Sequence, residues 1–268
     1  MWKLYKKYLV FAVVAFIALG IGIVNFKHSP SSEKNKFLVV GLDSSYPPFD
    51  FVDGKGNIIG FDVDVAQLIA DKLDLDLVVK DMEFEGMILS LKQGKIDLIL
   101  SGMNITPSRL KEILMVPYHG EATTHLSLIF WGEIPNGIQK LEDITKLPKG
   151  CVSVQSGAVS EAYLSRFPAI KVKSFQGALG PLMDVKYGKS TANLVEPDVA
   201  EYLKGQHPEI EIINIPLPSE EQILGFGIGI KKENQELFDQ VAAIIQELKG
   251  SGELKKLEDK WFKEGGHG

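Results

Sequence analysis

Cysteine is almost absent from this sequence, which contains one, Cys151, in 268 residues. A single cysteine excludes an intrachain disulfide. Because it lies far from the N-terminus, it also excludes a lipid-modified cysteine behind an export signal. In the segment Cys151-Val-Ser-Val we expect it to be a small apolar residue of a buried strand.

The sequence also lacks an excess of positive charge and any spacing typical of metal ligands. The formal net charge is −6 and no basic stripe is interleaved with aromatic residues, which argues against a nucleic-acid partner. The histidines, at positions 28, 119, 125, 207 and 267, show no spacing such as HExxH. The glycines between Gly225 and Ile230 have no following helix where a phosphate-binding loop needs one. We therefore expect no metal, no cofactor and no catalytic residue.

The N-terminal segment differs in composition from the rest. Three lysines among the first seven residues precede an uncharged, apolar run from Tyr8 to Phe26. This is typical of an export signal, and its length is borderline for a membrane-spanning helix. Residues 1–26 are therefore predicted to be either a signal peptide or an N-terminal membrane anchor. Residues 27–36 are predicted to be a polar linker, and both alternatives place the remainder outside the cytoplasm.

From Phe37 onward, short apolar runs alternate with helical patterns. Strands are predicted at Phe37–Leu42, Leu75–Val79, Ile96–Leu100, Cys151–Gln155, Val172–Phe175, Asn193–Val195 and Glu211–Ile215, with a hairpin around residues 53–57. Helices are predicted at Phe61–Leu73, Phe84–Gln93 and Leu237–Leu248, at starts near Pro107, Val159, Gly177 and Pro197, and in a tail reaching Trp261. Such alternation indicates an α/β protein with mainly parallel sheets.

Two extended runs, Leu126–Trp131 and Ile223–Ile230, separate the two series of elements. The pattern predicts two lobes, each a mainly parallel sheet flanked by helices, joined by two hinge strands. Lobe 1 would comprise residues 37–124 plus 223–268, and lobe 2 residues 125–222. Phe49 and Phe61 are assigned to the core.

The segment after the predicted strand Ile96–Leu100 suggests an anion site. Thr106 is a good N-cap and Pro107 suits the first helical position, so Arg109 falls in the first turn of a helix. The N-terminus of a helix is electropositive. Free N–H groups around Gly102 to Asn104, together with the guanidinium of Arg109, would form a receptacle for one carboxylate.

Other strand ends offer further polar and aromatic side chains. In open α/β sheets, ligands lie beyond the carboxyl ends of the strands. The candidate ligand-binding residues at these ends are Asp43, Tyr46, Phe84, Ser101, Gly102, Met103, Asn104, Arg109, Gln155, Gly157, Ala158 and Glu196.

Several local motifs occur together and in a fixed order. They are Asp43-x-x-Tyr46-Pro-Pro-Phe49, Gly60-Phe61-Asp62-Val63-Asp64, Gly94-Lys-Ile-Asp97, Asn104-Ile-Thr-Pro-x-Arg109 and Val154-Gln155-x-Gly157. The chain resembles the extracytoplasmic amino-acid-binding proteins of ABC importers, which have the two-lobed type II periplasmic-binding-protein fold. Within this family it is most similar to arginine-binding proteins, and Ile105 to Tyr118 is similar to the chlamydial branch.

The resemblance implies a role for each charged candidate. It assigns Arg109, helped by the backbone N–H groups of Gly102 and Asn104, to the α-carboxylate of the ligand. It assigns Glu196 to the α-ammonium group. Asp43 corresponds to a position that faces the distal charge in relatives that select cationic amino acids.

The aromatic candidates and one departure complete what the resemblance implies. Tyr46 and Phe84 correspond to two rings that sandwich the ligand side chain. Where many relatives have Thr after the glycine, this chain has Ala158, so a hydroxyl to the carboxylate is lost. The backbone N–H of that turn is expected to remain available.

Each of these residues also has a purely structural alternative. Arg109 could be a solvated helix residue, and Glu196 could cap the helix that begins at Pro197. Tyr46 and Phe84 could be core aromatics. Asp43 could close a turn with its own backbone.

The expected function is that of an extracytoplasmic, non-enzymatic receptor. It would capture an L-amino acid, arginine or another cationic one, by closing two lobes, and deliver it to the permease of an ABC transporter. We expect a periplasmic or extracytoplasmic monomer that contacts the inner membrane through its N-terminal segment if that segment is uncleaved. The alternative is an exported enzyme on the same fold, similar to the cyclohexadienyl or arogenate dehydratases.

Overall fold

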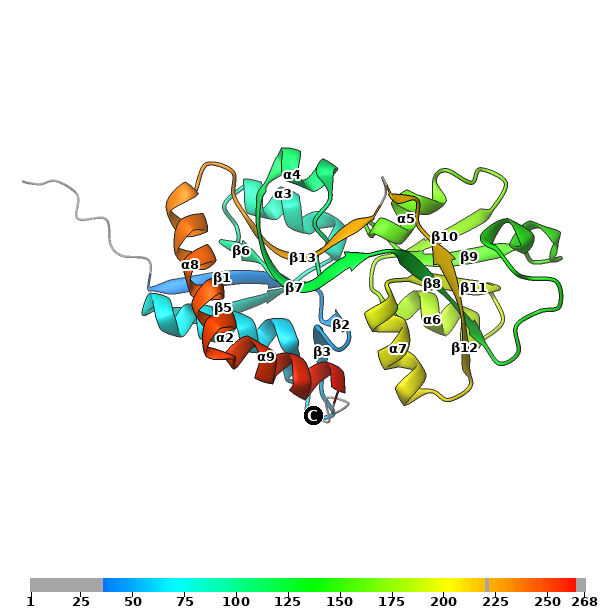
Figure 1. Ribbon diagram of the computed structural model, residues 1–268, viewed down its shortest axis with the longest axis horizontal. Coiled ribbons are helices and arrows are strands. Elements are labelled where there is room, and N and C mark those ends of the chain that lie inside the picture. Colours follow the sequence, from blue (N-terminus) through cyan, green and yellow to red (C-terminus); the bar gives the residue numbers. More distant parts are fainter. Residues whose placement is uncertain (1–35, 220–221, 264–268) are drawn as a thin grey trace, which may run out of the picture. The chain divides into compact units, whose positions relative to one another are not determined.

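Two five-stranded sheets organise this protein, whose computed structural model describes residues 36–219 and 222–263. The part from Phe37 onward is one compact unit. The predicted segment 1–26 and all but the last residue of the predicted linker 27–36 lie outside the described residues. The first sheet has the order β5-β1-β6-β13-β7 and the second the order β10-β9-β11-β8-β12 (Figure 1).

The elements of the first sheet come from both ends of the described chain. Its strands are β5 (Asp76–Asp81), β1 (Phe37–Leu42), β6 (Leu98–Ile99), β13 (Ile223–Ile230) and β7 (Leu114–Thr123). Its helices are α2 (Phe61–Leu73), η1 (Phe84–Gly86), α3 (Met87–Lys92), α4 (Pro107–Glu112), α8 (Gln235–Ser251), α9 (Glu253–Glu258) and the short π-helix η4 (Asp259–Lys263). A small sheet of β2 (Ser45–Tyr46), β3 (Asp50–Val52) and β4 (Ile58–Ile59) contains the predicted hairpin.

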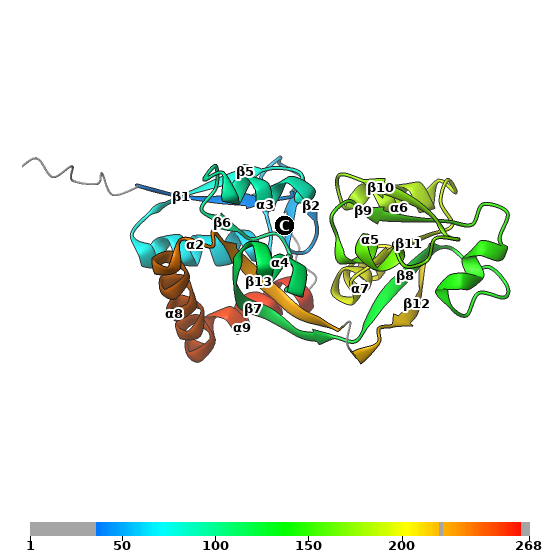
Figure 2. The same ribbon diagram turned by 90° about the horizontal axis from the view of Figure 1, so that it is seen from above.

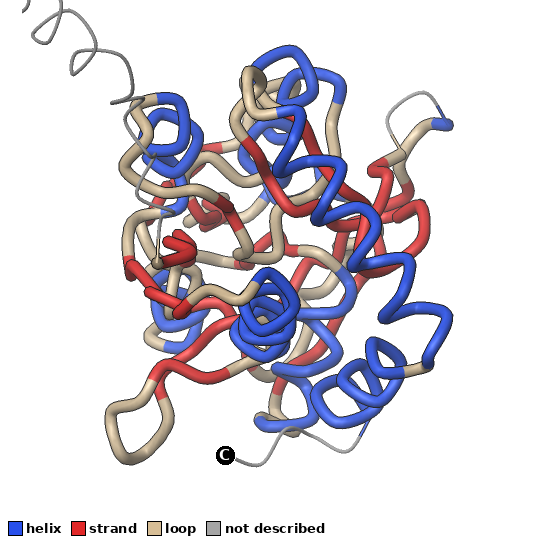
Figure 3. The backbone as a smooth tube through the Cα atoms, turned by 90° about the vertical axis from the view of Figure 1, so that its left-hand side faces the viewer, coloured by secondary structure: helices blue, strands red, loops and turns tan. Residues whose placement is uncertain are grey.

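The second sheet is built from the middle of the chain. Its strands are β10 (Lys171–Phe175), β9 (Cys151–Gln155), β11 (Ala192–Val195), β8 (His125–Trp131) and β12 (Ile210–Pro216). Its helices are η2 (Leu141–Lys146), α5 (Val159–Leu164), α6 (Leu179–Lys186) and α7 (Pro197–Gln206). Figure 3, which looks at the molecule from the left-hand side of Figure 1, shows helices on more than one side of the strands.

Each sheet has a parallel part and an antiparallel part. Strand β1 pairs in parallel with β5 and β6, and β9 pairs in parallel with β10 and β11. Antiparallel strands complete the sheets, β13 and β7 in the first and β8 and β12 in the second. The inner parallel strands β6, β9 and β11 are almost entirely buried, as expected for parallel pairs, whereas the outer strands β5 and β10 are partly or fully exposed. The α/β prediction is therefore confirmed.

Two connections pass from one sheet to the other, and they lie side by side. Strand β7 continues into β8 through Thr124, and β12 continues toward β13. The Leu217 N–H donates a 2.8 Å hydrogen bond to the Thr124 carbonyl, which links the two connections (Figure 2). The prediction of two joining strands is confirmed.

Local sequence signals explain most of the helix ends. In α8, the Asn234 side chain accepts from the Leu237 N–H, and Gly252 closes the helix at φ 78°. In α4, the Thr106 hydroxyl accepts from the Arg109 N–H at 3.2 Å, and Pro107 is the first helical residue. The predicted start of α4 is confirmed, which places Arg109 in its first turn.

Strand β7 was not predicted from the sequence. It contains Pro117 and Gly120, and both residues argue against a strand. The fold tolerates Pro117 because β7 is an edge strand of the first sheet, where one row of backbone groups needs no partner. Pro117 is paired with Gly227 of β13. That position has no room for a larger side chain, because an added Cβ would lie 2.7 Å from Ile105.

Aromatic rings fill the core beside the first sheet. Phe49 and Phe61 are fully buried, which confirms their assignment, and the ring centroids of Phe49 and Phe226 are 4.7 Å apart. Phe61 stacks on Tyr118 with centroids 5.7 Å apart. The cluster reaches the loop that follows β6, where a Cβ added at Gly102 would lie 3.3 Å from the Phe49 ring.

Candidate functional site

Arg109 is a buried cation whose hydrogen bonds go to neutral partners. Its Nη1 donates to the Asn104 carbonyl at 2.8 Å and its Nη2 to the Gly157 carbonyl at 2.9 Å. The guanidinium lies over the Phe84 ring, 5.3 Å from the centroid. Burial lowers the pKa of Arg109 to about 10, which still leaves it charged at neutral pH. The alternative of a solvated helix residue is wrong, because Arg109 is only 8% exposed.

Glu196 and Tyr46 form a buried pair between the two sheets. The Tyr46 hydroxyl donates to Glu196 Oε2 at 2.7 Å. Burial raises the pKa of Glu196, whereas the Tyr46 hydroxyl and the positive charge of Arg109 act in the opposite direction. Glu196 stands at the N-cap position of α7 but makes no side-chain cap hydrogen bond. Its carboxylate therefore serves the region between the sheets and not its own helix.

Asp43 lies at the carboxyl end of β1 and reaches the second sheet. Its Oδ1 accepts from the Ser45 N–H at 3.0 Å and the Ser45 hydroxyl at 2.6 Å, so Asp43 does close a turn. Its Oδ2 accepts from Gln155 Nε2 at 2.6 Å. Burial raises the pKa of Asp43. All of these donors are neutral, so they stabilise the carboxylate without cancelling its charge.

The N–H of Gly102 is not free, and this sequence expectation is wrong. It donates to Asp62 Oδ2 at 2.7 Å, because the fully buried Asp62 carboxylate needs donors. Gly102 has φ 52°, and an added Cβ would lie 2.5 Å from the Tyr46 ring. The glycine therefore allows the close approach of Tyr46.

Asn104 retains a backbone orientation suited to an anion. It forms an antiparallel bridge with Phe226, in which the hydrogen bonds come from the flanking Ile105 and Gly227 N–H groups. In this arrangement the N–H and C=O of Asn104 itself both point away from Phe226. Its C=O accepts from Arg109 there, so its N–H is directed to the same side as the guanidinium.

Ser101 and Met103 have protein partners of their own. The Ser101 hydroxyl accepts from the Asp43 N–H at 2.8 Å and donates to Asp50 at 3.0 Å. Met103 is buried in a core cluster with Phe84, and its carbonyl accepts from the Gly227 N–H. The Ser101 hydroxyl and the Met103 carbonyl are therefore already occupied by protein partners.

The turn that precedes α5 faces the first sheet, but its N–H groups are occupied. Gly157 N–H donates to the Glu161 carboxylate at 2.8 Å, and Ala158 N–H donates to the Gln155 carbonyl at 3.3 Å. The expectation that this turn keeps an available N–H is therefore wrong. Gly157 contributes its carbonyl to Arg109 instead.

The two aromatic candidates have different neighbours. Tyr46 stacks on Phe49 with ring centroids 5.5 Å apart, and Phe84 lies under the guanidinium of Arg109. Both rings are buried. Tyr46 is also a hydrogen-bond donor, which the sequence analysis did not foresee. A sandwich of both rings around a ligand stays a prediction.

Ser45 is a residue of this region that the sequence analysis did not select. Its hydroxyl donates to Asp43 and accepts from the Ala178 N–H at 2.7 Å, which joins β2 to the start of α6. A Cβ at Gly177 would lie 2.9 Å from the Ser45 hydroxyl. The signal was the motif Asp-x-Ser, in which the serine follows a turn-closing aspartate.

Two cavities lie beside these residues. A small one of about 20 Å³ is lined by Tyr46, Gln155, Ala158, Asn193 and Glu196, among others. An open cavity of about 330 Å³ is lined by three acidic residues, Asp43, Asp81 and Glu83, among others. The carboxyl ends of both sheets thus meet at one junction, and its open side is acidic.

Within residues 36–219 and 222–263, no group of His, Cys, Asp and Glu side chains is arranged to hold a metal ion. The helices described in those ranges are all too short or too polar to cross a membrane.

Comparison with known proteins defines the class. Residues 38–264 match the bacterial extracellular solute-binding proteins, family 3, and the chain belongs to that family. A curated relative, named a probable ABC transporter arginine-binding protein, ArtJ, from Chlamydia trachomatis, is 40% identical over 235 residues, 88% of this chain and 89% of its own length. The resemblance found in the sequence is confirmed. The family's description and the names of the curated relatives are those of solute-binding proteins and not of enzymes.

Solved structures agree with this assignment. A mutant of ArgBP from T. maritima has a TM-score of 0.77 and 32% identity, over 85% of this chain and 95% of that one. An ancestral arginine-binding protein bound to arginine has a TM-score of 0.76 and 31% identity, over 85% of this chain and 99% of that one. These neighbours support the two-lobed fold.

Proposed function

We propose that this protein captures L-arginine, or another cationic amino acid, between its two lobes and delivers it to the permease of an ABC transporter. One observation supports the ligand class above all. Three buried charges, Arg109, Asp43 and Glu196, meet at one junction, and the hydrogen-bond partners given above for each are neutral. Burying a charge costs several kcal/mol. Arg109 and Glu196 attract each other, whereas no cation is among the partners given above for Asp43.

The signs of these charges match an arginine molecule. The protein offers one cation and two anions, whereas free arginine has one carboxylate and two cationic groups. Arg109, with the Asn104 N–H beside it, would bind the α-carboxylate, and Glu196 the α-ammonium. Asp43 would face the guanidinium of the ligand. Glutamine has only one positive charge and would leave Asp43 without a counter-charge.

The open acidic cavity favours entry of a cation. Asp43, Asp81 and Glu83 line it, and like charges at a cleft attract an oppositely charged ligand. Relatives named as arginine-binding proteins, reported above, support the same choice.

Lobe closure would supply the signal for delivery. Arg109, Asp43 and Tyr46 come from the part we assign to lobe 1 (residues 37–124 and 223–268), and Glu196 from lobe 2 (residues 125–222). A ligand that contacts both favours the closed form by its differential affinity. We further propose that the protein acts outside the cytoplasm as a monomer, with residues 1–26 as signal or anchor.

Isothermal titration calorimetry of the purified protein with each of the twenty amino acids tests the ligand. Arginine should bind, with lysine weaker and glutamine weaker still. Absence of heat or of a thermal shift with every amino acid would contradict the proposal. Incubation with prephenate and arogenate serves as the control for the dehydratase alternative, and no product is expected.

A further inference from the structure

Two carboxyl groups, Asp50 and Asp62, bind adjacent residues of the loop that follows β6, Ser101 and Gly102. Both side chains are fully buried, and the Asp62 N–H donates at 2.9 Å to the carbonyl of Phe49, the residue before Asp50. Asp50 begins β3 and Asp62 lies in the first turn of α2. Two carboxylates cannot form a hydrogen bond with each other unless one of them is protonated. A proton on one of the two would turn that group into a donor to the other.

Asp62 has the environment of the charged partner. Its Oδ2 accepts from the Gly102 N–H at 2.7 Å and its Oδ1 from the Tyr118 hydroxyl at 2.5 Å. It also lies at a helix N-terminus, which stabilises negative charge. With the proton of Asp50, this carboxylate accepts three hydrogen bonds.

Asp50 has the environment of the neutral partner. Its Oδ2 accepts from the Ser101 hydroxyl at 3.0 Å, whereas its Oδ1 is a buried oxygen with no partner if it is treated as a charged acceptor. A proton on Asp50 removes that deficit, because the acid then donates to Asp62. Burial and the charge of Asp62 both raise the pKa of Asp50 well above its ordinary value.

We propose that Asp50 and Asp62 share one proton at neutral pH, with Asp50 as the donor, and that this pair positions the Ser101–Gly102 loop for ligand binding. Asp50 holds the Ser101 hydroxyl, which in turn accepts from the Asp43 N–H. Asp62 holds Gly102, which lies against the Tyr46 ring. The positioning half of this inference rests on the proposed function, whereas the shared proton does not.

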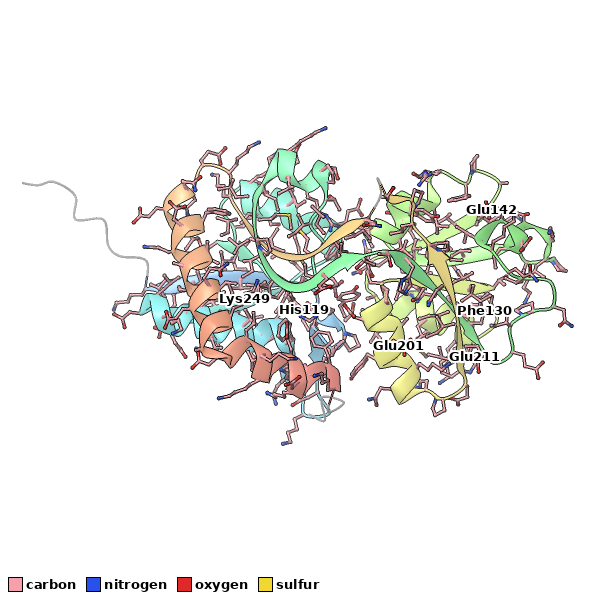
Figure 4. The ribbon with its side chains drawn as sticks, viewed as in Figure 1. His119, Phe130, Glu142, Glu201, Glu211 and Lys249 are labelled. Carbon is pink, nitrogen blue, oxygen red and sulfur yellow. The ribbon has the colours of Figure 1, made fainter. Side chains whose placement is uncertain are left out.

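Other titratable groups face the pair from the surrounding elements. Asp43 and Tyr46 lie on the side of Asp50, from the β1 end and β2. Tyr118 and His119 face Asp62 from β7. The centroids of the His119 and Phe61 rings are 4.9 Å apart, and His119 Nδ1 lies 2.9 Å from Glu258 Oε1. Figure 4 labels His119, which belongs to β7.

Two substitutions distinguish the donor from the acceptor. In Asp50→Asn, the amide donates to Asp62 and its oxygen still accepts from Ser101, so we expect arginine affinity within about threefold of wild type. In Asp62→Asn, an NH₂ group must face the Gly102 N–H or the Tyr118 hydroxyl. We expect that mismatch to lower arginine affinity at least about tenfold.

The proton itself is measured through stability. Asp50 holds a proton in the folded protein at pH 7 and loses it on unfolding, so the unfolded state binds one proton fewer. The unfolding equilibrium constant should therefore rise with pH about tenfold per unit more in wild type than in Asp50→Asn. Asp71→Asn, an exposed aspartate of the same helix, is the matched control and should keep the wild-type slope.

An infrared measurement keeps the test decisive if Asp62→Asn does not fold. Wild type at pH 7 should show the C=O stretching band of a buried carboxylic acid, and Asp50→Asn should lack it. Equal pH slopes in wild type and Asp50→Asn, or no such band, would overturn the shared proton. Equal loss of arginine affinity in both variants would overturn the assignment of donor and acceptor. If wild type binds no amino acid while the slope difference persists, the proposed function and the positioning role fail and the shared proton stands.

Discussion

Arg109 Nη2 donates a 2.9 Å hydrogen bond to the main-chain carbonyl of Gly157, so one guanidinium joins the end of the first sheet to the turn that follows β9. The same group lies over Phe84 and donates to Asn104. A side chain that links the two sheets and remains charged while buried is suited to couple ligand binding to closure.

Arg109→Lys should weaken arginine binding although it keeps the charge. An ammonium group cannot reproduce the planar fork that holds two acceptors and a carboxylate together. We expect a loss of about 1.5–3 kcal/mol, roughly 10- to 100-fold in Kd, measured by calorimetry. Lys111→Ala, an exposed residue of the same helix, should leave Kd unchanged. Wild-type affinity in Arg109→Lys would show that the carboxylate binds elsewhere.

Asp43→Asn should change selectivity more than stability. The Asn oxygen can still accept from Ser45, and the Gln155 amide can turn to present its oxygen to the new NH₂ group. Arginine affinity should fall by about 1.5–3 kcal/mol, while glutamine affinity stays within about threefold. Asp81→Asn removes an exposed charge of the same cavity and should have a much smaller effect. An equal loss for arginine and glutamine would contradict a distal role for Asp43.

Arginine binding should weaken as the pH falls from about 8 to about 5. Burial raises the pKa of both Glu196 and Asp43, so these acids take up protons first and lose the charge that a cationic ligand needs. Arg109, with a pKa of about 10, stays charged throughout. Calorimetry across this range in buffers of different ionisation enthalpy should show proton release on binding at the acidic end.

Tyr46→Phe tests whether Glu196 is the group that causes this pH dependence. It removes the hydroxyl that lowers the pKa of Glu196, so that pKa should rise further and the loss of binding should begin at a higher pH. Tyr187→Phe, at an exposed tyrosine, should leave the profile unchanged. Identical profiles in Tyr46→Phe and wild type would exclude Glu196 as the titrating group.

Gly102→Ala should destabilise the protein and displace Tyr46. The residue has φ 52°, which costs a non-glycine residue about 1–2 kcal/mol, and the new Cβ would lie 2.5 Å from the Tyr46 ring. Gly56→Ala also has a positive φ but has open space around it, so it should show the backbone cost alone. Denaturant unfolding should therefore show a larger loss for Gly102→Ala, and similar losses in both variants would contradict the contact with Tyr46.

The sequence by itself determined the class of this protein and most of its elements. Alternating strands and helices indicated an α/β fold, and Thr106 and Pro107 marked the start of α4 because capping and fixed φ are local effects. Strand ends can also be located from local sequence patterns, so the residues that follow them could be selected as the candidate site. Strand β7 was missed because Pro117 argues locally against a strand, and only its place at a sheet edge permits it.

Only the tertiary structure decided which polar groups are already occupied. Asp62 takes the Gly102 N–H, Glu161 takes the Gly157 N–H, and Tyr46 donates to Glu196. Tyr46 and Glu196 are 150 residues apart, so no local pattern could pair them. Sequence motifs show which groups can donate or accept. Burial decides the pairing, because each group removed from water must find a partner among whatever the fold brings near it.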